Sequence, residues 1–116
     1  MSDATRRQPI PTIPAPELRV DVSLWLAAKL GDAPVVDDIL ARREVGIEKY
    51  GCPLYARNGR DAMVDAYQEV LDLMVYLAQD DIEQGRKIAS QNLRYAHELA
   101  MSLRAELQWR AHASRV

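Results

Sequence analysis

The sequence lacks several features that particular classes of protein need. It has one cysteine, Cys52, among 116 residues, so no internal disulfide can form, and we expect a cytoplasmic protein. No apolar run approaches the roughly 20 residues of a membrane span. Charged residues and prolines stand at the N-terminus, where a signal peptide needs an apolar segment. The sequence therefore predicts no membrane partner.

Neither sign of charge dominates the chain. Lys and Arg number 15, Asp and Glu number 17, and the formal net charge is -2. The positive residues are scattered, which argues against a nucleic-acid polymer as a partner. Phe is absent, and the aliphatic residues are Leu, Val, Ala and Ile, which suit packing between helices. A chain of this length forms one domain with a modest core, and an oligomer would help to bury it.

The pattern of apolar residues predicts an all-α fold, a bundle of three to four helices. Residues 1–15 are polar and proline-rich and are expected to form a flexible N-terminal arm, or an arm that wraps a neighbouring subunit. A single all-α domain is expected over residues 16–116. The expected helices span residues 16–30, 35–50, 61–83 and 86–113. Asp32 is expected to cap the second helix, Gly51 to end it, and Asn58 or Asp61 to cap the third.

The stretch from Asp61 to Ala78 carries the most informative pattern. It has no Gly or Pro and is mostly apolar, which predicts a helix buried most of the way round. Yet Asp65, Glu69 and Asp72 fall on one face of that helix. Buried carboxylates are costly unless something positive meets them. A metal ion is the simplest positive partner.

A second pair of acids lies on the preceding helix. Glu44 and Glu48 are four residues apart and share a face. The connecting loop of residues 51–60 lets the two helices lie antiparallel, so that both pairs face one another. An all-oxygen set suits Mg²⁺ or Mn²⁺, and Mg²⁺ usually keeps positions for water and substrate phosphate. The alternative for Glu44 and Glu48 is a solvated face paired with Arg43 and Lys49. The predicted metal ligands are Glu44, Glu48, Glu69 and Asp72.

Positive and polar side chains lie between these two acid pairs in the sequence. An arginine can bind a phosphate through two parallel hydrogen bonds, and a lysine can bind it as a point charge. Local ion pairs explain the presence of each of these positive residues equally well. Asn58 either forms a hydrogen bond with the edge of a base or only stabilises the turn that it begins. Tyr76 either stacks on a base or fills the core. The predicted substrate-binding residues are Lys49, Arg57, Asn58, Arg60, Asp65 and Tyr76.

Three segments together resemble a known family. They read K-Y-G-C-P-L at residues 49–54, N-G-R-D-A at residues 58–62, and D-A-Y-Q-E-V-L-D with a following Y-L within residues 65–77. The run is similar to the all-α nucleoside triphosphate pyrophosphohydrolases, the MazG-like and dimeric dUTPase-like superfamily. It resembles most closely the small MazG-like proteins of phages and prophages. The resemblance covers residues 35–80.

The resemblance implies a Mg²⁺-dependent reaction in which activated water splits a nucleoside triphosphate between its α and β phosphates. The products are a nucleoside monophosphate and pyrophosphate, and family members form dimers or tetramers. Glu69 and Asp72 match the family's E-x-x-D ligands. Glu44 and Glu48 stand for its E-x-x-E motif, although three residues rather than two separate them. The implied catalytic residues are Glu44, Glu48 and Glu69.

Two other functions fit the same residues. One is a non-catalytic protein of this fold that binds or sequesters a nucleotide. The other is a structural helical oligomerisation module, whose acid stripe is neutralised by arginines of a partner.

Overall fold

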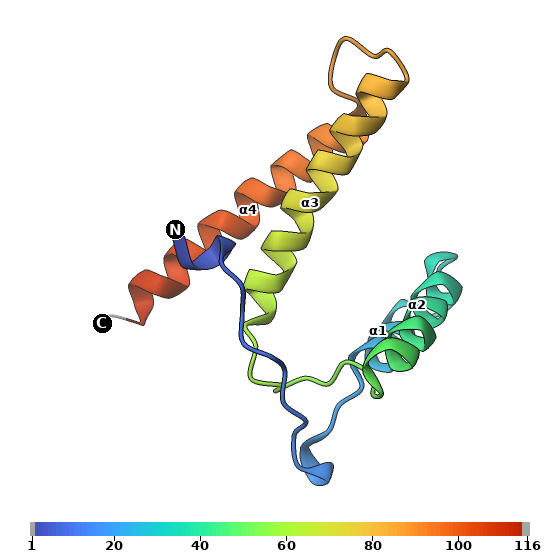
Figure 1. Ribbon diagram of the computed structural model, residues 1–116, viewed down its shortest axis with the longest axis vertical. Coiled ribbons are helices and arrows are strands. Elements are labelled where there is room, and N and C mark those ends of the chain that lie inside the picture. Colours follow the sequence, from blue (N-terminus) through green and yellow to red (C-terminus); the bar gives the residue numbers. More distant parts are fainter. Residues whose placement is uncertain (1, 115–116) are drawn as a thin grey trace. The chain divides into compact units, whose positions relative to one another are not determined.

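The computed structural model describes residues 2–114, and the regular secondary structure of these residues is helical (Figure 1). The four α-helices are α1 (Val22–Leu30), α2 (Val35–Tyr50), α3 (Ala62–Glu83) and α4 (Gln91–Ala113), with short 3₁₀ turns η1 (Ser2–Thr5) and η2 (Pro16–Leu18) before them. The all-α prediction is confirmed. None of these helices is both long and apolar enough to cross a membrane.

The chain divides into two compact units. Residues 2–8 join α3 and α4 in one unit, and residues 9–60, with α1 and α2, form the other. The predicted division into an arm of residues 1–15 and one domain of residues 16–116 stays a prediction. Met1, Arg115 and Val116, which that division includes, lie outside the described residues.

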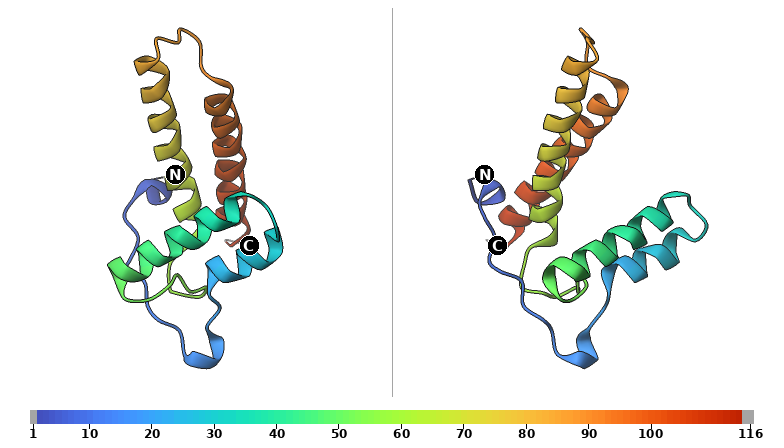
Figure 2. Two further views of the ribbon diagram at one scale, coloured as in Figure 1. Left: turned by 90° about the vertical axis from the view of Figure 1, so that its right-hand side faces the viewer. Right: turned by 45° about the vertical axis from the view of Figure 1, so that its right-hand side comes forward.

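In the first unit, α3 and α4 lie side by side and antiparallel, with the N-terminal turn η1 beside α3 (Figures 1 and 2). Their small core contains Ala4, Tyr67, Val70, Ala100 and Leu107. The partly buried residues packed against this core are Met63, Val64, Leu71, Met74 and Leu103.

The expectation that the third helix is buried most of the way round is wrong for this chain. Only Tyr67, Val70 and Asp81 of α3 are buried. The reason is that within its unit α3 packs against α4, η1 and the short segment after η1, so its other faces remain open. Exposed large apolar side chains of α3 are Leu73, Val75, Tyr76 and Ile82.

Asp81 determines where α3 ends and α4 begins. Its carboxylate accepts hydrogen bonds from the Ser90 backbone N–H (2.9 Å) and from Arg86 Nη1 (3.0 Å). Its carbonyl accepts from the Arg86 backbone N–H (2.8 Å). The bond from Ser90, opposed by burial and helped by Arg86, lowers the pKa of Asp81. These bonds hold residues 86–89 in a loop, so the expected helix start at residue 86 is wrong and α4 begins after its N-cap, Ser90.

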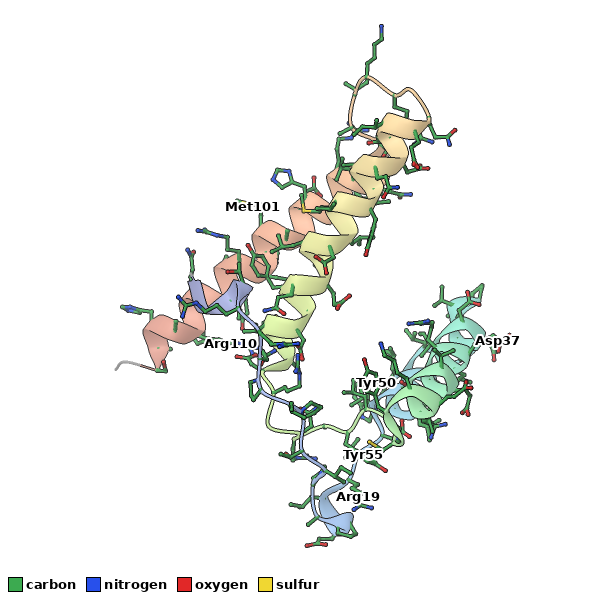
Figure 3. The ribbon with its side chains drawn as sticks, viewed as in Figure 1. Arg19, Asp37, Tyr50, Tyr55, Met101 and Arg110 are labelled. Carbon is green, nitrogen blue, oxygen red and sulfur yellow. The ribbon has the colours of Figure 1, made fainter. Side chains whose placement is uncertain are left out.

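In the second unit, α1 begins at Val22 rather than at residue 16. The side chain of Asp21 caps α1 by accepting from the Leu24 N–H at 3.3 Å. An isolated β-bridge between Asp21 and Tyr55 keeps the backbone before the cap extended. Arg19 lies over the Tyr55 ring, 5.6 Å from its centroid, beside this bridge (Figure 3). A partner 34 residues away therefore interrupts the helix that the local pattern predicts.

Asp21 also joins α1 to α2. Arg43 donates two hydrogen bonds to its carboxylate, at 3.0 and 2.7 Å, and this pairing lowers the pKa of Asp21. The span of α2 agrees with the predicted residues 35–50, and it ends at Gly51, whose φ of 81° suits glycine. The expected cap by Asp32 is wrong, because the N-cap is Pro34 and no side chain caps the helix.

The pair of α1 and α2 has no interior of its own. No residue of either helix, both of which lie wholly in the described part, is buried. The large apolar side chains that they expose are Leu24, Trp25, Leu30, Val35, Val45 and Tyr50.

Candidate functional site

Two of the predicted metal ligands lie together on α3. Glu69 and Asp72 are three residues apart on one face of the helix, and both are exposed. Neither forms a hydrogen bond or an ion pair with any residue from 2 to 114. Two carboxylates that face solvent without a protein partner are available to a ligand. They are oxygen donors, the type that Mg²⁺ prefers.

Asp65, one turn earlier on α3, takes part in holding the N-terminal segment. Its carboxylate accepts a hydrogen bond from the side-chain amide of Gln8 at 2.6 Å. The same amide donates to the Asp61 carbonyl (2.9 Å) and accepts from the Asp61 backbone N–H (2.7 Å). Asp61 itself caps α3, accepting from the N–H groups of Met63 and Val64. Gln8 therefore binds to the first turn of α3 through three hydrogen bonds.

Gln68 fixes the segment one turn further along α3. Its side-chain amide donates to the carbonyls of Ala4 (3.1 Å) and Arg6 (2.7 Å). Ala4 is 6% exposed and lies in the core. Residues 4–8, which we call the docked segment, thus follow the face of α3 that carries Asp65, Gln68 and Asp72 at spacings of three and four residues.

An open pocket of about 310 Å³ lies between the docked segment and α3. Asp72 and Leu71 line it from the helix, with Gln68 at its edge. Its residues from the docked segment are Thr5, Arg6 and Arg7. One acidic residue and two arginines therefore line the same space.

The other predicted metal ligands lie on α2, in the second unit. Glu44 accepts a hydrogen bond from Arg43 at 2.8 Å, and 69% of its side chain is exposed. This is the local pairing that the sequence offered as the alternative for Glu44. Glu48 is exposed and forms no hydrogen bond or ion pair within the described chain. Because α2 and α3 belong to different units, the facing of the two acid pairs stays a prediction.

The predicted substrate-binding cations all have contacts within the second unit. Lys49 lies over the Tyr50 ring, with Nζ 5.1 Å from the centroid. Arg57 Nη1 donates to the Leu18 carbonyl (3.2 Å), and Arg60 Nη1 donates to the Pro9 carbonyl (2.8 Å). The Leu18 carbonyl is neutral and a guanidinium has five donors, so Arg57 keeps donors for an anion.

The remaining two predicted residues take different positions. Asn58 accepts from the Arg60 N–H through its side-chain oxygen (3.1 Å), and its carbonyl accepts from Thr12 (2.7 Å). This is the turn role that the sequence offered as one alternative. Tyr76 is 68% exposed on α3, so it does not fill the core of its unit.

No cluster of three or more His, Cys, Asp or Glu residues that could hold a metal lies among the described residues. Within one unit, the structure gives a pair of carboxylates rather than the set of four. That pair, with its open positions, fits a cation that takes its other ligands from water, from a phosphate or from further carboxylates.

Sequence reasoning missed Arg6 and Arg7, which lie in a segment expected to be flexible. No local signal marks them, because the pairing of Gln8 with Asp61 and of Gln68 with Ala4 joins residues more than 50 positions apart. The spacing of Asp65, Gln68 and Asp72 is the one readable hint of a polar face on α3. No family model, curated protein or solved structure matches this chain.

Proposed function

We propose that the protein is a Mg²⁺-dependent nucleoside triphosphate pyrophosphohydrolase of the MazG-like kind, acting on a nucleotide in the cytoplasm. The observation that carries the proposal is the pair Glu69 and Asp72, exposed and without a protein partner on α3, beside a pocket that two arginines also border. This arrangement supports binding of a cation and a phosphate side by side. The likeness of residues 35–80 to MazG-like proteins supplies the reaction.

In this proposal Glu69 and Asp72 would hold the Mg²⁺, together with Glu44 and Glu48 of α2. Mg²⁺ held there would supply positive charge for phosphoryl oxygens and would activate a water molecule for attack. One of the α2 glutamates orients the attacking water by accepting its hydrogen bond. The pyrophosphate end of the nucleotide would meet Lys49, Arg57 and Arg60. The hydrogen bond of Arg57 to the Leu18 carbonyl leaves other donors of that guanidinium for a phosphate.

The base end of the nucleotide has two candidate contacts. Tyr76, 68% exposed on α3, offers a ring on which a base can stack. Asn58 offers chiefly its amide N–H₂, because its side-chain oxygen already accepts from the Arg60 N–H. We therefore assign the larger share of base binding to Tyr76. Asp65 acts indirectly, because its carboxylate accepts a hydrogen bond from Gln8 of the docked segment.

We also propose that two or four copies assemble. The supporting observation is the apolar surface that each unit leaves open, including Trp25 on α1 (55% exposed) and Trp109 on α4 (66% exposed). A pair of helices without a buried residue needs a further surface to pack on, since most helical stability comes from such packing. Sedimentation equilibrium measures the assembly, and a monomer at micromolar concentration would contradict it.

The test of the function is a panel of ribo- and deoxyribonucleoside triphosphates incubated with the protein and Mg²⁺. We expect release of pyrophosphate rather than of orthophosphate from at least one of them, and none when EDTA removes the metal. A protein that releases no pyrophosphate but melts at a higher temperature with a nucleotide is a nucleotide-binding protein. If neither a nucleotide nor Mg²⁺ changes the melting temperature, the acid pair is structural.

A further inference from the structure

The N-terminal segment is attached to α3 by specific bonds rather than by apolar contact alone. Gln8 exchanges hydrogen bonds with the Asp61 backbone and donates to Asp65, and Gln68 donates to two carbonyls of the docked segment. Ala4 is buried in the core at one end. Both ends of the docked segment are therefore fixed, and the backbone of Arg6 and Arg7 runs between them.

The two arginines have no other role among the described residues. Both side chains are exposed, and neither forms a hydrogen bond or an ion pair there. Asp72, across the same pocket, is equally without a partner. If the docked segment served to neutralise the acid face, a guanidinium would pair with Asp72 directly. Instead, Arg6, Arg7 and Asp72 all line an open space of about 310 Å³ and do not pair across it.

A metal-bound polyphosphate carries both a positive charge that can pair with Asp72 and negative charges that can pair with the two arginines. A divalent cation satisfies carboxylates, and the phosphate oxygens that it does not cover need cationic donors. Guanidinium groups provide these as pairs of parallel N–H bonds. A free anion alone would be repelled by Asp72 and Glu69, and a free cation alone would be repelled by the arginines.

We propose that Arg6 and Arg7 of the docked segment bind phosphate oxygens of a Mg²⁺-bound polyphosphate in the pocket beside Asp72. Its identity as the triphosphate of a nucleotide rests on the function proposed above. Gln8 and Gln68 act as positioning residues, because they hold the backbone that carries the two arginines.

The experiment measures binding of inorganic tripolyphosphate, with Mg²⁺ present, by calorimetry on the full chain. The double variant R6A/R7A removes both guanidinium groups from exposed positions, so the fold is retained, which circular dichroism checks. We expect affinity to fall about tenfold or more, the loss of at least one charge-assisted hydrogen bond. The matched control is R104A, which removes an exposed arginine on α4 of the same unit that likewise has no partner among the described residues.

A second variant separates positioning from mere stability. Q68A is expected to weaken tripolyphosphate binding, and to have no further effect when R6A/R7A are already present, because it acts through those arginines. Equal weakening by Q68A in both backgrounds would show that Gln68 acts independently and would overturn the positioning role.

The outcomes distinguish this inference from the proposed function. Four results would overturn the inference, even if the wild type releases pyrophosphate from nucleotides. They are unchanged affinity in R6A/R7A, tighter binding in R6A/R7A, an equal loss of affinity in R104A, and no binding of tripolyphosphate by the wild type. Binding that depends on the arginines supports it, even if no nucleotide is hydrolysed. Repeating the titration with adenosine and with ATP separates the sources: ATP and tripolyphosphate, but not adenosine, are expected to respond to R6A/R7A.

Discussion

Removing the side-chain amide of Gln68 should release the docked segment from α3. In Q68A, the hydrogen bonds to the carbonyls of Ala4 and Arg6 (3.1 and 2.7 Å) are lost. A hydrogen bond between neutral groups contributes about 1 kcal/mol net. Because one of the two is exposed, we expect a loss of about 1 to 2 kcal/mol in the free energy of docking. This corresponds to an increase of about 5- to 30-fold in the undocked population.

Trypsin provides the assay, because it cleaves after Arg6 and Arg7 and the substitution leaves both cleavage sites unaltered. When opening is fast relative to cleavage, the cleavage rate follows the population of the open form. We therefore expect mass spectrometry to show cleavage at these two bonds about 5- to 30-fold faster in Q68A than in the wild type.

The control is Q79A, which removes an exposed glutamine of α3 whose amide bonds only to Glu83. It should leave the cleavage rate at Arg6 and Arg7 unchanged. A rate in Q68A equal to that of the wild type would refute the account of how the segment is held. Equal acceleration in Q79A would show that general loosening of α3 causes the effect.

Two further substitutions test the contacts that define the helix ends. D21A removes the cap of α1 and the partner of Arg43, and should lower the free energy of unfolding by about 2 kcal/mol. Urea denaturation followed by circular dichroism measures this loss. The control D32A, at an exposed position without a partner among the described residues, should have almost no effect. For Asp81, whose pKa is lowered from 3.8 chiefly by the Ser90 N–H, the carboxylate contributes stability that is fully present above pH 3.8 and is lost as the pH falls through the lower folded-state pKa. D81N should therefore be less stable than the wild type at pH 6 and should lose less stability on acidification below pH 4. An identical slope in the two proteins would contradict the role of Asp81.

The helices could be predicted where their signals are local. Pro34 and Gly51 bound the second helix, and α2 spans the residues expected. Asp61 was one of two expected caps of the third helix and is the one observed. The sequence could not show that residues 19–21 are extended, because the bridge of Asp21 to Tyr55 depends on residues far along the chain. The start of α4 was misplaced for the same kind of reason, since Asp81 binds two backbone N–H groups of the following loop.

The candidate site was predictable only in part. The acid face of α3 follows from the period of the helix, and Glu69 and Asp72 indeed share it. The burial expected for that helix was wrong, because an apolar sequence does not say how many neighbours one chain provides. The position of the arginines of the docked segment could not be predicted from the sequence. The glutamine hydrogen bonds that hold this segment join residues more than 50 positions apart, and such pairs produce no repeating pattern in the sequence.

The most direct test of the account is the Mg²⁺-dependent release of pyrophosphate by E69Q, measured beside E98Q. Glu98 is an exposed glutamate on α4 of the same unit, without a partner among the described residues, so it matches the change in charge. With the best nucleotide of the panel, we expect E69Q to lose activity by about a hundredfold or more, because a metal ligand is lost, while its melting temperature stays close to that of the wild type. We expect E98Q to retain wild-type activity. Wild-type turnover by E69Q would contradict the assignment of Glu69, and with it the account of α3 as the helix that carries the reaction.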